Sequence, residues 1–304
     1  MTSVTPYRGI LLSGGSGTRL HPLTQTVSKQ LLPVYDKPMI YYPLTTLMLA
    51  GIRSILIITG PQDQELYRNL LRDGSQWGID ISYAVQEEPK GIAQALLIGE
   101  VFSQGQPVAL MLGDNILYAA GLSETLQDAA KPADGATIFG YRVRNPSRYG
   151  VVKLDSGGNP IELVEKPDQP ISPWAIPGLY FYDGEAASIA HSIEPSARNE
   201  LEITDVNREY LRRDRLKVEL LPRGTAWLDM GTHDSLLDAA NFVKVIEERQ
   251  GLKIACPEEV AYTKGFIGLE ELEAAANRYR GSAYGDYLVG LLHRTPQQTG
   301  RGVE

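Results

Sequence analysis

The chain has 304 residues, 43% of them hydrophobic, so it holds enough apolar material to bury a sizeable core. Its formal net charge of −8 argues against a nucleic-acid partner, because binding a phosphate backbone requires concentrated Lys and Arg. The single cysteine excludes an intrachain disulfide and a thiolate metal cluster, which fits a reducing cytoplasm. No apolar run approaches the ~18 residues that span a bilayer, and the N-terminal residues do not resemble a signal peptide. We therefore expect a cytoplasmic protein without membrane contact.

Short hydrophobic runs alternate with helical segments through the first half of the chain. The expected strands are rich in Ile, Val and Leu and cover residues 8–13, 54–59, 81–85, 107–112 and 136–143. The expected helices between them cover residues 39–50, 62–71, 92–102 and 122–130. This alternation predicts an α/β fold with a doubly wound, mostly parallel sheet of Rossmann-like type.

The second half begins with a different pattern, in which strands are joined by turns. Residues 149–154 and 161–165 flank a Ser-Gly-Gly-Asn turn and predict a β-hairpin. The other expected strands cover residues 178–182, 217–221 and 225–228, and the expected helices cover 203–213, 233–250, 269–278 and 284–293. No Pro-, Gly- or Ser-rich linker separates these parts, so we expect one domain with a continuous mixed sheet, a hairpin insertion and a helical C-terminal region.

A glycine-rich segment follows the first expected strand. Gly14, Gly15 and Gly17 permit positive φ angles, and successive N–H groups in such a loop form a nest for phosphate oxygens. The segment is not a P-loop, because no Lys follows the relevant glycine. It is also a poor dinucleotide fingerprint, because Leu20 takes the place of the third small residue and two prolines interrupt the expected crossover helix. Phosphate binding and a simple tight turn both remain compatible with the glycines.

Two basic residues lie just after these glycines. Arg19 suits bidentate contact with a phosphate, and Lys29 suits a point-charge contact. An isolated Arg or Lys is more often a solvated surface charge. Their position beside the glycine-rich segment favours triphosphate binding.

Two aspartates follow expected strands, where open α/β sheets bind ligands. Asp114 comes directly after the run 107–112, and Asp229 lies between an expected strand and an expected helix. Carboxylates are ligands that Mg²⁺ prefers, although a strand-end Asp is more often a turn or cap residue. Two such positions are compatible with a shared Mg²⁺ ion, but the spacing alone does not show that the two residues meet. Glu165 and Lys166 end the expected hairpin and suit a sugar hydroxyl and a sugar phosphate, unless they form only a solvated ion pair.

Taken together, these motifs resemble those of the bacterial glucose-1-phosphate thymidylyltransferases, a family of the sugar nucleotidyltransferase superfamily. The likeness extends from about residue 7 to residue 293. The motifs that carry it are SGGSGTRL at 13–20, SKQ at 28–30, KPMIYYP at 37–43, GDN at 113–115, VEKP at 164–167, EITDVN at 202–207 and WLDMGTH at 227–233.

The resemblance implies a role for each matching position. The nucleotide dTTP would be bound by Gly14, Gly15, Ser16, Gly17, Thr18, Arg19, Gln86 and Gly91. The sugar phosphate would be bound by Tyr149, Gly150, Glu165, Lys166 and Arg198. Asp114 and Asp229 would bind Mg²⁺ and, with Arg19 and Lys29, form the catalytic set. Residues 1–143 would then form the nucleotide-binding half, 144–250 the sugar-phosphate-binding half, 251–294 an interface or regulatory region, and 295–304 a tail.

The reaction that the resemblance implies joins dTTP and glucose 1-phosphate to give dTDP-glucose and pyrophosphate, for dTDP-rhamnose or another deoxysugar. The attacking phosphate is already anionic, so an in-line displacement needs no general base. The family also implies a homotetramer. Some positions depart from the family pattern: Ser13, Lys90, Met230, residues 119–123 and residues 263–264. The last two groups argue against feedback inhibition by a dTDP-sugar.

Three other functions are alternatives to this one. Uridylyl transfer or another nucleotidyl transfer stays open, because the methyl group of thymine is worth only about 1–3 kcal/mol in an apolar pocket. A non-catalytic nucleotide-sugar-binding protein would not need to retain both acids and both basic residues. A nicotinamide oxidoreductase would need the dinucleotide fingerprint that the sequence lacks.

Overall fold

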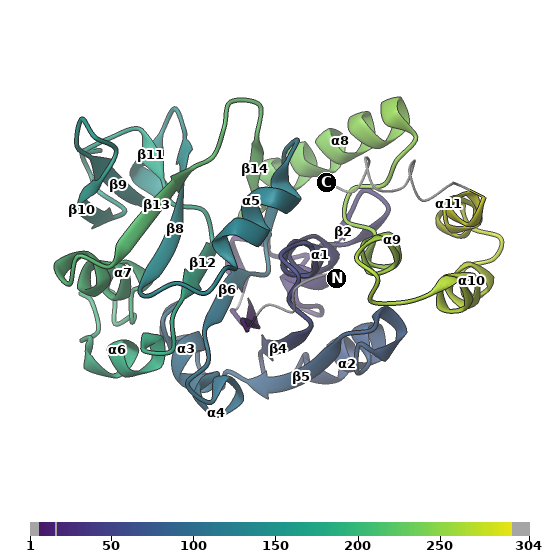
Figure 1. Ribbon diagram of the computed structural model, residues 1–304, viewed down its shortest axis with the longest axis horizontal. Helices are drawn as coiled ribbons and strands as arrows, with labels where there is room; N and C mark the ends of the chain where they lie inside the picture. Colours follow the sequence, from purple (N-terminus) through teal and green to yellow (C-terminus); the bar gives the residue numbers. More distant parts are fainter. Residues whose placement is uncertain (1–5, 16, 294–304) are drawn as a thin grey trace.

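The computed structural model describes residues 6–15 and 17–293, and the expected tail lies outside these residues. A ten-stranded mixed sheet crosses the centre of the molecule (Figure 1). Its strands are β1 (Arg8–Ser13), β4 (Ser54–Thr59), β5 (Asp80–Val85), β6 (Val108–Leu112), β8 (Ala136–Arg142), β9 (Gly150–Leu154), β10 (Pro160–Glu165), β11 (Trp174–Ala175), β12 (Leu179–Tyr182) and β13 (Leu216–Leu220). The order is β10-β9-β11-β8-β12-β6-β1-β4-β5, and β13 pairs with β8. The α/β fold expected from the sequence is confirmed.

The sheet has a parallel half and a mixed half. Strands β6, β1, β4 and β5 are parallel neighbours, and they come from the part of the chain where strands alternate with helices. Strands β8 to β12 form antiparallel pairs, and β12 also pairs antiparallel with β6. After β1 the chain moves outward through β4 to β5 and then returns to the other side of β1 as β6. The carboxyl ends of β1 and β6 therefore form the edge where ligands bind in open α/β sheets.

Helices cover both faces of the sheet (Figure 1). They are α1 (Tyr41–Leu49), α2 (Gln64–Leu71), α3 (Gln94–Ile98), α4 (Glu100–Ser103), α5 (Leu122–Ala129), α6 (Ala186–Ser192), α7 (Ile203–Arg212), α8 (His233–Gln250), α9 (Pro257–Thr263), α10 (Leu269–Arg278) and α11 (Ala283–Leu292). In β1, Leu11 joins the cluster around α1, whereas Ile10 and Leu12 join the cluster around α3, α6 and α7. The alternation follows the period of two of a strand buried on both faces.

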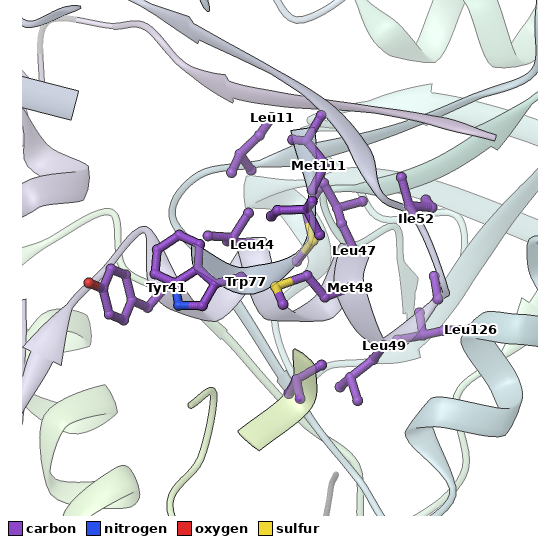
Figure 2. Packing of buried hydrophobic residues seen from close by; sticks show 14 of the residues in the cluster. Leu11, Tyr41, Leu44, Leu47, Met48, Leu49, Ile52, Trp77, Met111 and Leu126 are labelled. Atoms are coloured by element: carbon purple, nitrogen blue, oxygen red, sulfur yellow. The ribbon is translucent and has the colours of Figure 1, made fainter. Parts of the chain in front are cut away.

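Helix α1 is the centre of the larger cluster. All nine of its residues are buried, which agrees with a segment that is apolar all around rather than on one side. Figure 2 shows Leu44, Leu47 and Met48 of this helix close to Leu11 of β1 and Met111 of β6, with Trp77 beside Tyr41. This packing fixes the helix under the strands whose carboxyl ends carry the glycine-rich segment and Asp114.

Several elements differ from the expectation. The expected helix 92–102 is two short helices, α3 and α4, separated at Gly99. A Cβ on Gly99 would lie 2.5 Å from Ile10 Cδ1, so this point is set by close packing on β1. Helices α6 and α9 were not expected. The expected strand 225–228 is β14 (Ala226–Asp229), which lies outside the large sheet and pairs with an unexpected strand, β7 (Asn115–Tyr118). A second small sheet contains β2 (Pro33–Val34) and β3 (Lys37–Pro38).

The start of α8 agrees with the sequence. The Thr232 Oγ1 accepts a bond from Ser235 N at 3.2 Å, and the Ser235 Oγ accepts one from Thr232 N at 2.9 Å. This capping box satisfies the free N–H groups of the first turn. It fixes where the chain turns directly after Asp229. Within the described residues, none of the helices is both long and apolar enough to cross a membrane.

Candidate active site

The glycine-rich segment and Asp114 emerge from adjacent strands. Register pairs Leu12 of β1 with Leu112 of β6, and Gly113 N donates to Leu12 O at 2.9 Å. A Cβ on Gly113 would lie 2.6 Å from Ser13 Oγ, so the two chains are in contact where they leave the sheet. The sequence expectation that these two motifs lie at one edge agrees with the structure.

The β7–β14 pair brings the second aspartate to the same place. Asp229 stands opposite Asn115 in the register, and Met230 N donates to Asp114 O at 3.1 Å. The expectation of one continuous sheet is wrong for the strand before Asp229, because β14 belongs to a separate two-stranded sheet. The two residues meet because antiparallel pairing places the end of β14 beside the start of β7.

Opposite charges lie between and around these carboxylates. Lys29, only 6% exposed, forms an ion pair with Asp114 Oδ2. Arg148 Nη2 lies 3.8 Å from Asp229 Oδ2. Burial, followed by the nearby Asp114 charge, raises the pKa of Asp229 despite the opposing effect of Lys29, Arg19 and Arg148. The carboxylates are therefore close enough to repel each other.

Both acids open into a cavity of about 260 Å³. The cavity is lined by Arg19, Ile92, Leu112, Asp114, Asn115, Arg148, Tyr149, Gly150, Glu165, Lys166, Ile176, Gly178, Tyr180, Ile203, Thr204, Asn207, Trp227 and Asp229. No His or Cys is among these lining residues, so the described walls offer no imidazole or thiol for nucleophilic catalysis.

Residues of the hairpin segment also line the cavity. Tyr149 packs on Trp227 with a ring-centroid distance of 4.7 Å. Glu165 accepts a hydrogen bond from Thr204 Oγ1 at 2.5 Å, and its Oε1 lies 3.6 Å from Lys166 Nζ. Lys166 has a positive φ of 43°, a strained conformation for a residue with a side chain. Such strain is commonly found at functional sites.

Arg198 does not line the main cavity. It lines an adjoining cavity of about 320 Å³ that shares Glu165 and Lys166. Its guanidinium donates to Glu202 Oε1 at 2.8 Å and lies 3.5 Å from Glu165 Oε1. These acids hold Arg198 in the adjoining cavity, which shares Glu165 and Lys166 with the main one.

Of the residues expected to read the base, Gln86 lies beside the start of the glycine-rich segment, and Gly91 does not contact that segment. Gln86 is 4% exposed and donates from Nε2 to Gln94 Oε1 at 2.7 Å. A Cβ on Gly14 would lie 2.2 Å from Gln86 Oε1, so only glycine permits this contact. Gly91 packs on the backbone of Leu201 and not on the cavity wall.

The rest of the glycine-rich segment leads to the basic pair. Gly15 and Gly17 have φ angles of 121° and 58°, whereas Ser16 lies outside the described residues. Thr18 begins a short 3₁₀ turn that carries Arg19. Arg19 is exposed, and a Cβ on Gly231 would lie 3.0 Å from its Nη2. Its guanidinium therefore rests against the backbone that follows Asp229.

Residues that sequence reasoning gave no role also line the cavity. Arg148, Tyr180, Thr204 and Trp227 all do so. Trp227 and Thr204 lie within motifs that carry the resemblance, so their positions were visible in the sequence. Arg148 had no such signal, because its short 3₁₀ turn and the pairing of β14 together bring it near Asp229.

A larger cavity, of about 510 Å³, lies on another part of the molecule and includes Glu124 and Lys264. None of the residues predicted to be catalytic lines it. Lys264 Nζ donates to Ser123 Oγ at 2.5 Å, and burial lowers the pKa of Lys264. Thr263 Oγ1 bonds to carbonyls of its own helix. The departures from the family pattern at 263–264 thus have local partners.

Gly91 offers a test of the packing beside the site. Its φ is 101°, and a Cβ there would lie 2.4 Å from Leu201 O. We expect Gly91→Ala to lower the free energy of unfolding by at least about 1–3 kcal/mol, measured by urea denaturation, because the left-handed conformation alone has that cost. Gly290→Ala in α11 is the matched control, since no atom lies within 4 Å of its Cβ position. If the two variants were equally stable, the close contact of Gly91 with the Leu201 backbone and the strain at its positive φ would both be contradicted.

The aspartate pair has the chemistry of a divalent-cation site. Within residues 6–15 and 17–293, no group of three or more His, Cys, Asp and Glu side chains forms a protein-only metal site. Two carboxylates beside a phosphate-binding loop instead fit Mg²⁺, which commonly takes one or two protein carboxylates together with substrate phosphates and water.

Comparison with known proteins gives a consistent result. The nucleotidyl transferase family model matches residues 8–245. The glucose-1-phosphate thymidylyltransferase of Xanthomonas campestris pv. campestris (strain B100) is 56% identical over 291 residues, covering 96% of this chain and 99% of that protein. The protein of the same name from Mycolicibacterium smegmatis is 57% identical over 287 residues, covering 94% of this chain and 99% of that protein.

Solved structures agree with the family. A Bacillus anthracis protein described as a glucose-1-phosphate thymidylyltransferase, crystallised with sucrose, has a TM-score of 0.71 and 37% identity over 78% of this chain and 94% of that chain. A UDP-glucose pyrophosphorylase complexed with UDP-glucose has a TM-score of 0.70 and 25% identity, covering 79% and 99%. The chain is a nucleotidyltransferase and belongs to the family of the glucose-1-phosphate thymidylyltransferases.

Proposed function

We propose that the protein transfers the deoxythymidylyl group of dTTP to α-D-glucose 1-phosphate, giving dTDP-glucose and pyrophosphate. One observation carries the proposal. Asp114 and Asp229, remote in sequence, meet beside Lys29 and Arg19, and both line a cavity that Glu165 also lines. The names of relatives at 56% and 57% identity support the choice of substrates.

Two groups of residues would bind the two substrates, one group for the nucleotide and one for the sugar phosphate. The nest of Gly14 to Gly17 and the guanidinium of Arg19 would hold the triphosphate. Glu165 would accept sugar hydroxyls, next to the backbone of Gly150. Lys166 and Arg198 would hold the sugar phosphate between the two adjoining cavities. The α-phosphorus would then lie between the basic pair and the sugar phosphate.

The chemical step is a single in-line displacement. An oxygen of the sugar phosphate attacks the α-phosphorus of dTTP, and a new P–O bond forms there. The bond between the α-phosphorus and the oxygen bridging to the β-phosphorus breaks, and pyrophosphate leaves on the opposite side. The attacking oxygen is already anionic, so no side chain has to remove a proton. Positioning and charge stabilisation by Arg19 and Lys29 supply the catalysis.

A Mg²⁺ ion belongs to this proposal. The raised pKa of Asp229 reflects negative charge that burial and Asp114 leave poorly compensated, which a divalent cation would relieve. Asp114 and Asp229 would hold the ion. When bound, Mg²⁺ would neutralise the charge on the phosphate oxygens. Lys29 would then be released from Asp114 to contact the reacting phosphate.

The test is a panel of nucleotides. Pyrophosphate release is measured with dTTP, UTP and ATP, with and without glucose 1-phosphate and Mg²⁺. We expect release to require both, with kcat/KM for UTP about 10- to 200-fold lower than for dTTP, because the pocket gains only one methyl contact. A preference for UTP would make the protein a uridylyltransferase. Binding of dTDP-glucose without any pyrophosphate release would leave only a nucleotide-sugar-binding protein.

The family also supports a cytoplasmic homotetramer. Light scattering of the purified chain would test the oligomeric state, and a monomer at micromolar concentration would contradict it.

A further inference from the structure

Tyr67 is a buried residue outside the main cavity whose hydroxyl contacts the segment that carries Lys29. It belongs to α2, its side chain is fully buried, and it packs in the cluster around α1. Its hydroxyl oxygen lies 2.9 Å from Ser28 Oγ and 3.3 Å from Gln30 Oε1. These two residues flank Lys29 in sequence, so one phenol contacts the chain on both sides of the lysine.

The three polar groups form one chain of hydrogen bonds. The Gln30 Oε1 is a carbonyl oxygen and can only accept, so Ser28 Oγ donates its single proton to it at 3.0 Å. The Ser28 oxygen then accepts from the Tyr67 hydroxyl. Burial raises the pKa of Tyr67, so the phenol keeps the proton that it donates. Ser28 and Gln30 are only 6% and 5% exposed, so solvent water hardly competes for these bonds.

Ser13, the last residue of β1, faces the same phenol. As a hydrogen-bond donor it lowers the pKa of Tyr67, against the larger effect of burial. This contact is looser than the other two, because among the residues that the structure describes the Ser13 hydroxyl has no partner with full hydrogen-bond geometry. Ser13 directly precedes Gly14, so the Tyr67 hydroxyl lies beside the start of the glycine-rich segment as well as the segment of Lys29.

The turn that carries Lys29 needs contacts of this kind. It is a 3₁₀ turn, Lys29–Leu31, with bonds from Leu31 N to Ser28 O and from Leu32 N to Lys29 O, both at 3.0 Å. A helix this short is not stable without tertiary contacts. Residues 21–27 before it are all exposed or half-buried, so the buried Ser28 is the first fixed point after them.

The position of this turn matters most when Lys29 leaves Asp114. In the proposed mechanism the ammonium group gives up its ion pair with Asp114 and contacts the reacting phosphate. Its location then depends on the backbone of the turn. The bonds to Tyr67 hold that backbone, because they involve the side chains of the neighbouring residues and leave the lysine side chain free to move.

We propose that Tyr67 is a positioning residue for the reaction. Its hydroxyl, acting through Ser28 and Gln30, fixes the turn from which Lys29 reaches the reacting phosphate. This inference rests on the proposed function, because that function gives Lys29 its catalytic task. The net free energy of one hydrogen bond corresponds to a factor of about 3 to 10 in rate or equilibrium.

The experiment removes only the hydroxyl, with Tyr67→Phe in the full-length protein. Pyrophosphate release is measured for the wild type, Tyr67→Phe, Lys29→Ala and the double variant, and kcat and KM are determined for each. We expect Tyr67→Phe to lower kcat about 3- to 10-fold, with KM for glucose 1-phosphate unchanged. In the Lys29→Ala background the same change should leave kcat as it is, because the effect passes through the lysine.

Tyr210→Phe is the matched control. Tyr210 is also fully buried on a helix, α7, and its hydroxyl donates to Asp183 Oδ1 at 2.7 Å. Neither of these two residues lines the main cavity. Both Phe variants should be less stable in urea than the wild type, but only Tyr67→Phe should have a lower kcat. A merely structural role for Tyr67 predicts that the two variants behave alike.

Two results would overturn the inference. One is a wild-type kcat in folded Tyr67→Phe, and the other is an equal further loss of kcat when Tyr67→Phe is added to Lys29→Ala. If Tyr67→Phe does not fold, Ser28→Ala breaks the same chain of bonds, and an unchanged kcat in that variant overturns the inference too. Absence of pyrophosphate release by the wild type with dTTP, UTP and ATP refutes the proposed function, and the inference with it.

Discussion

Replacing Lys29 by Ala is expected to lower kcat about a hundredfold or more. Its ammonium group is buried, lies beside Asp114 and is next in space to the glycine-rich segment, since a Cβ on Gly17 would lie 3.4 Å from Lys29 Cβ. A preorganised charge of this kind stabilises the transition state more than the ground state, and loss of one such donor typically has this effect. Steady-state assays with saturating dTTP and glucose 1-phosphate give kcat directly.

The control for this variant is Lys264→Ala. Lys264 is also partly buried and hydrogen-bonded, but it lies in the larger cavity away from both aspartates. It should retain the kcat of the wild type. Both variants are checked by circular dichroism, because Lys29→Ala leaves Asp114 without its ion-pair partner. A near-normal kcat in folded Lys29→Ala would refute the catalytic role of this lysine.

The bounds of an element were predictable where its own residues, such as a hydrophobic run or a helix cap, determine them. Strands β1 and β4 have the predicted bounds, because a run of Ile, Val and Leu between turn residues can only be buried as a strand here. Helix α8 also has its predicted bounds, since the Thr232 cap marks its start. The break at Gly99 could not be predicted, because it depends on the distance to Ile10 across the sheet.

The site itself depends on pairings that are distant in sequence. Asp114 and Asp229 could each be recognised as a strand-end carboxylate, but the β7–β14 pairing that joins them could not. The four residues of β7 give too short a signal, and its bond from Trp227 comes from 112 positions away. The roles carried over from the family stay predictions, both for the residues that line the cavity and for Gln86 and Gly91, which do not line it.

The charged neighbours of Arg198 could not be predicted from the sequence either. The family resemblance implies that Arg198 binds phosphate, but it does not indicate that Arg198 lies within 3.5 Å of Glu165, Glu200 and Glu202. These acids raise the pKa of Arg198, although its burial opposes them. The substrate phosphate would have to compete with three carboxylates, so Arg198 is expected to contribute less to affinity than a lone arginine would.

Asp229→Asn is expected to remove activity and, without divalent cations, to stabilise the protein at neutral pH. Burial and the Asp114 charge raise the pKa of Asp229 in the folded state. The folded protein therefore binds its proton more tightly than the unfolded chain, and stability falls as the pH rises through the raised pKa. At pH 7 the ionised Asp229 carboxylate destabilises the folded wild type. The neutral amide of Asp229→Asn does not have this destabilising effect.

Three measurements distinguish the loss of the buried Asp229 charge from the loss of a charge on the protein surface. The melting temperature of Asp229→Asn should exceed that of the wild type at about pH 7, and the gap should close as the pH falls to about 4, near the pKa of an unfolded Asp. Mg²⁺ with dTTP should raise the melting temperature of the wild type but not of the variant, because only the wild type retains both ligands. Its kcat should fall about a hundredfold or more.

Asp234→Asn provides the same change of charge five residues away, on the exposed first turn of α8. It should slightly lower stability, since a negative charge at a helix N-terminus is favourable, and it should leave kcat intact. Stability and activity would then change in opposite directions in the two variants. An Asp229→Asn protein that is less stable than the wild type at neutral pH, or equally active, would mean that the two aspartates are not the charged pair on which the proposed mechanism depends.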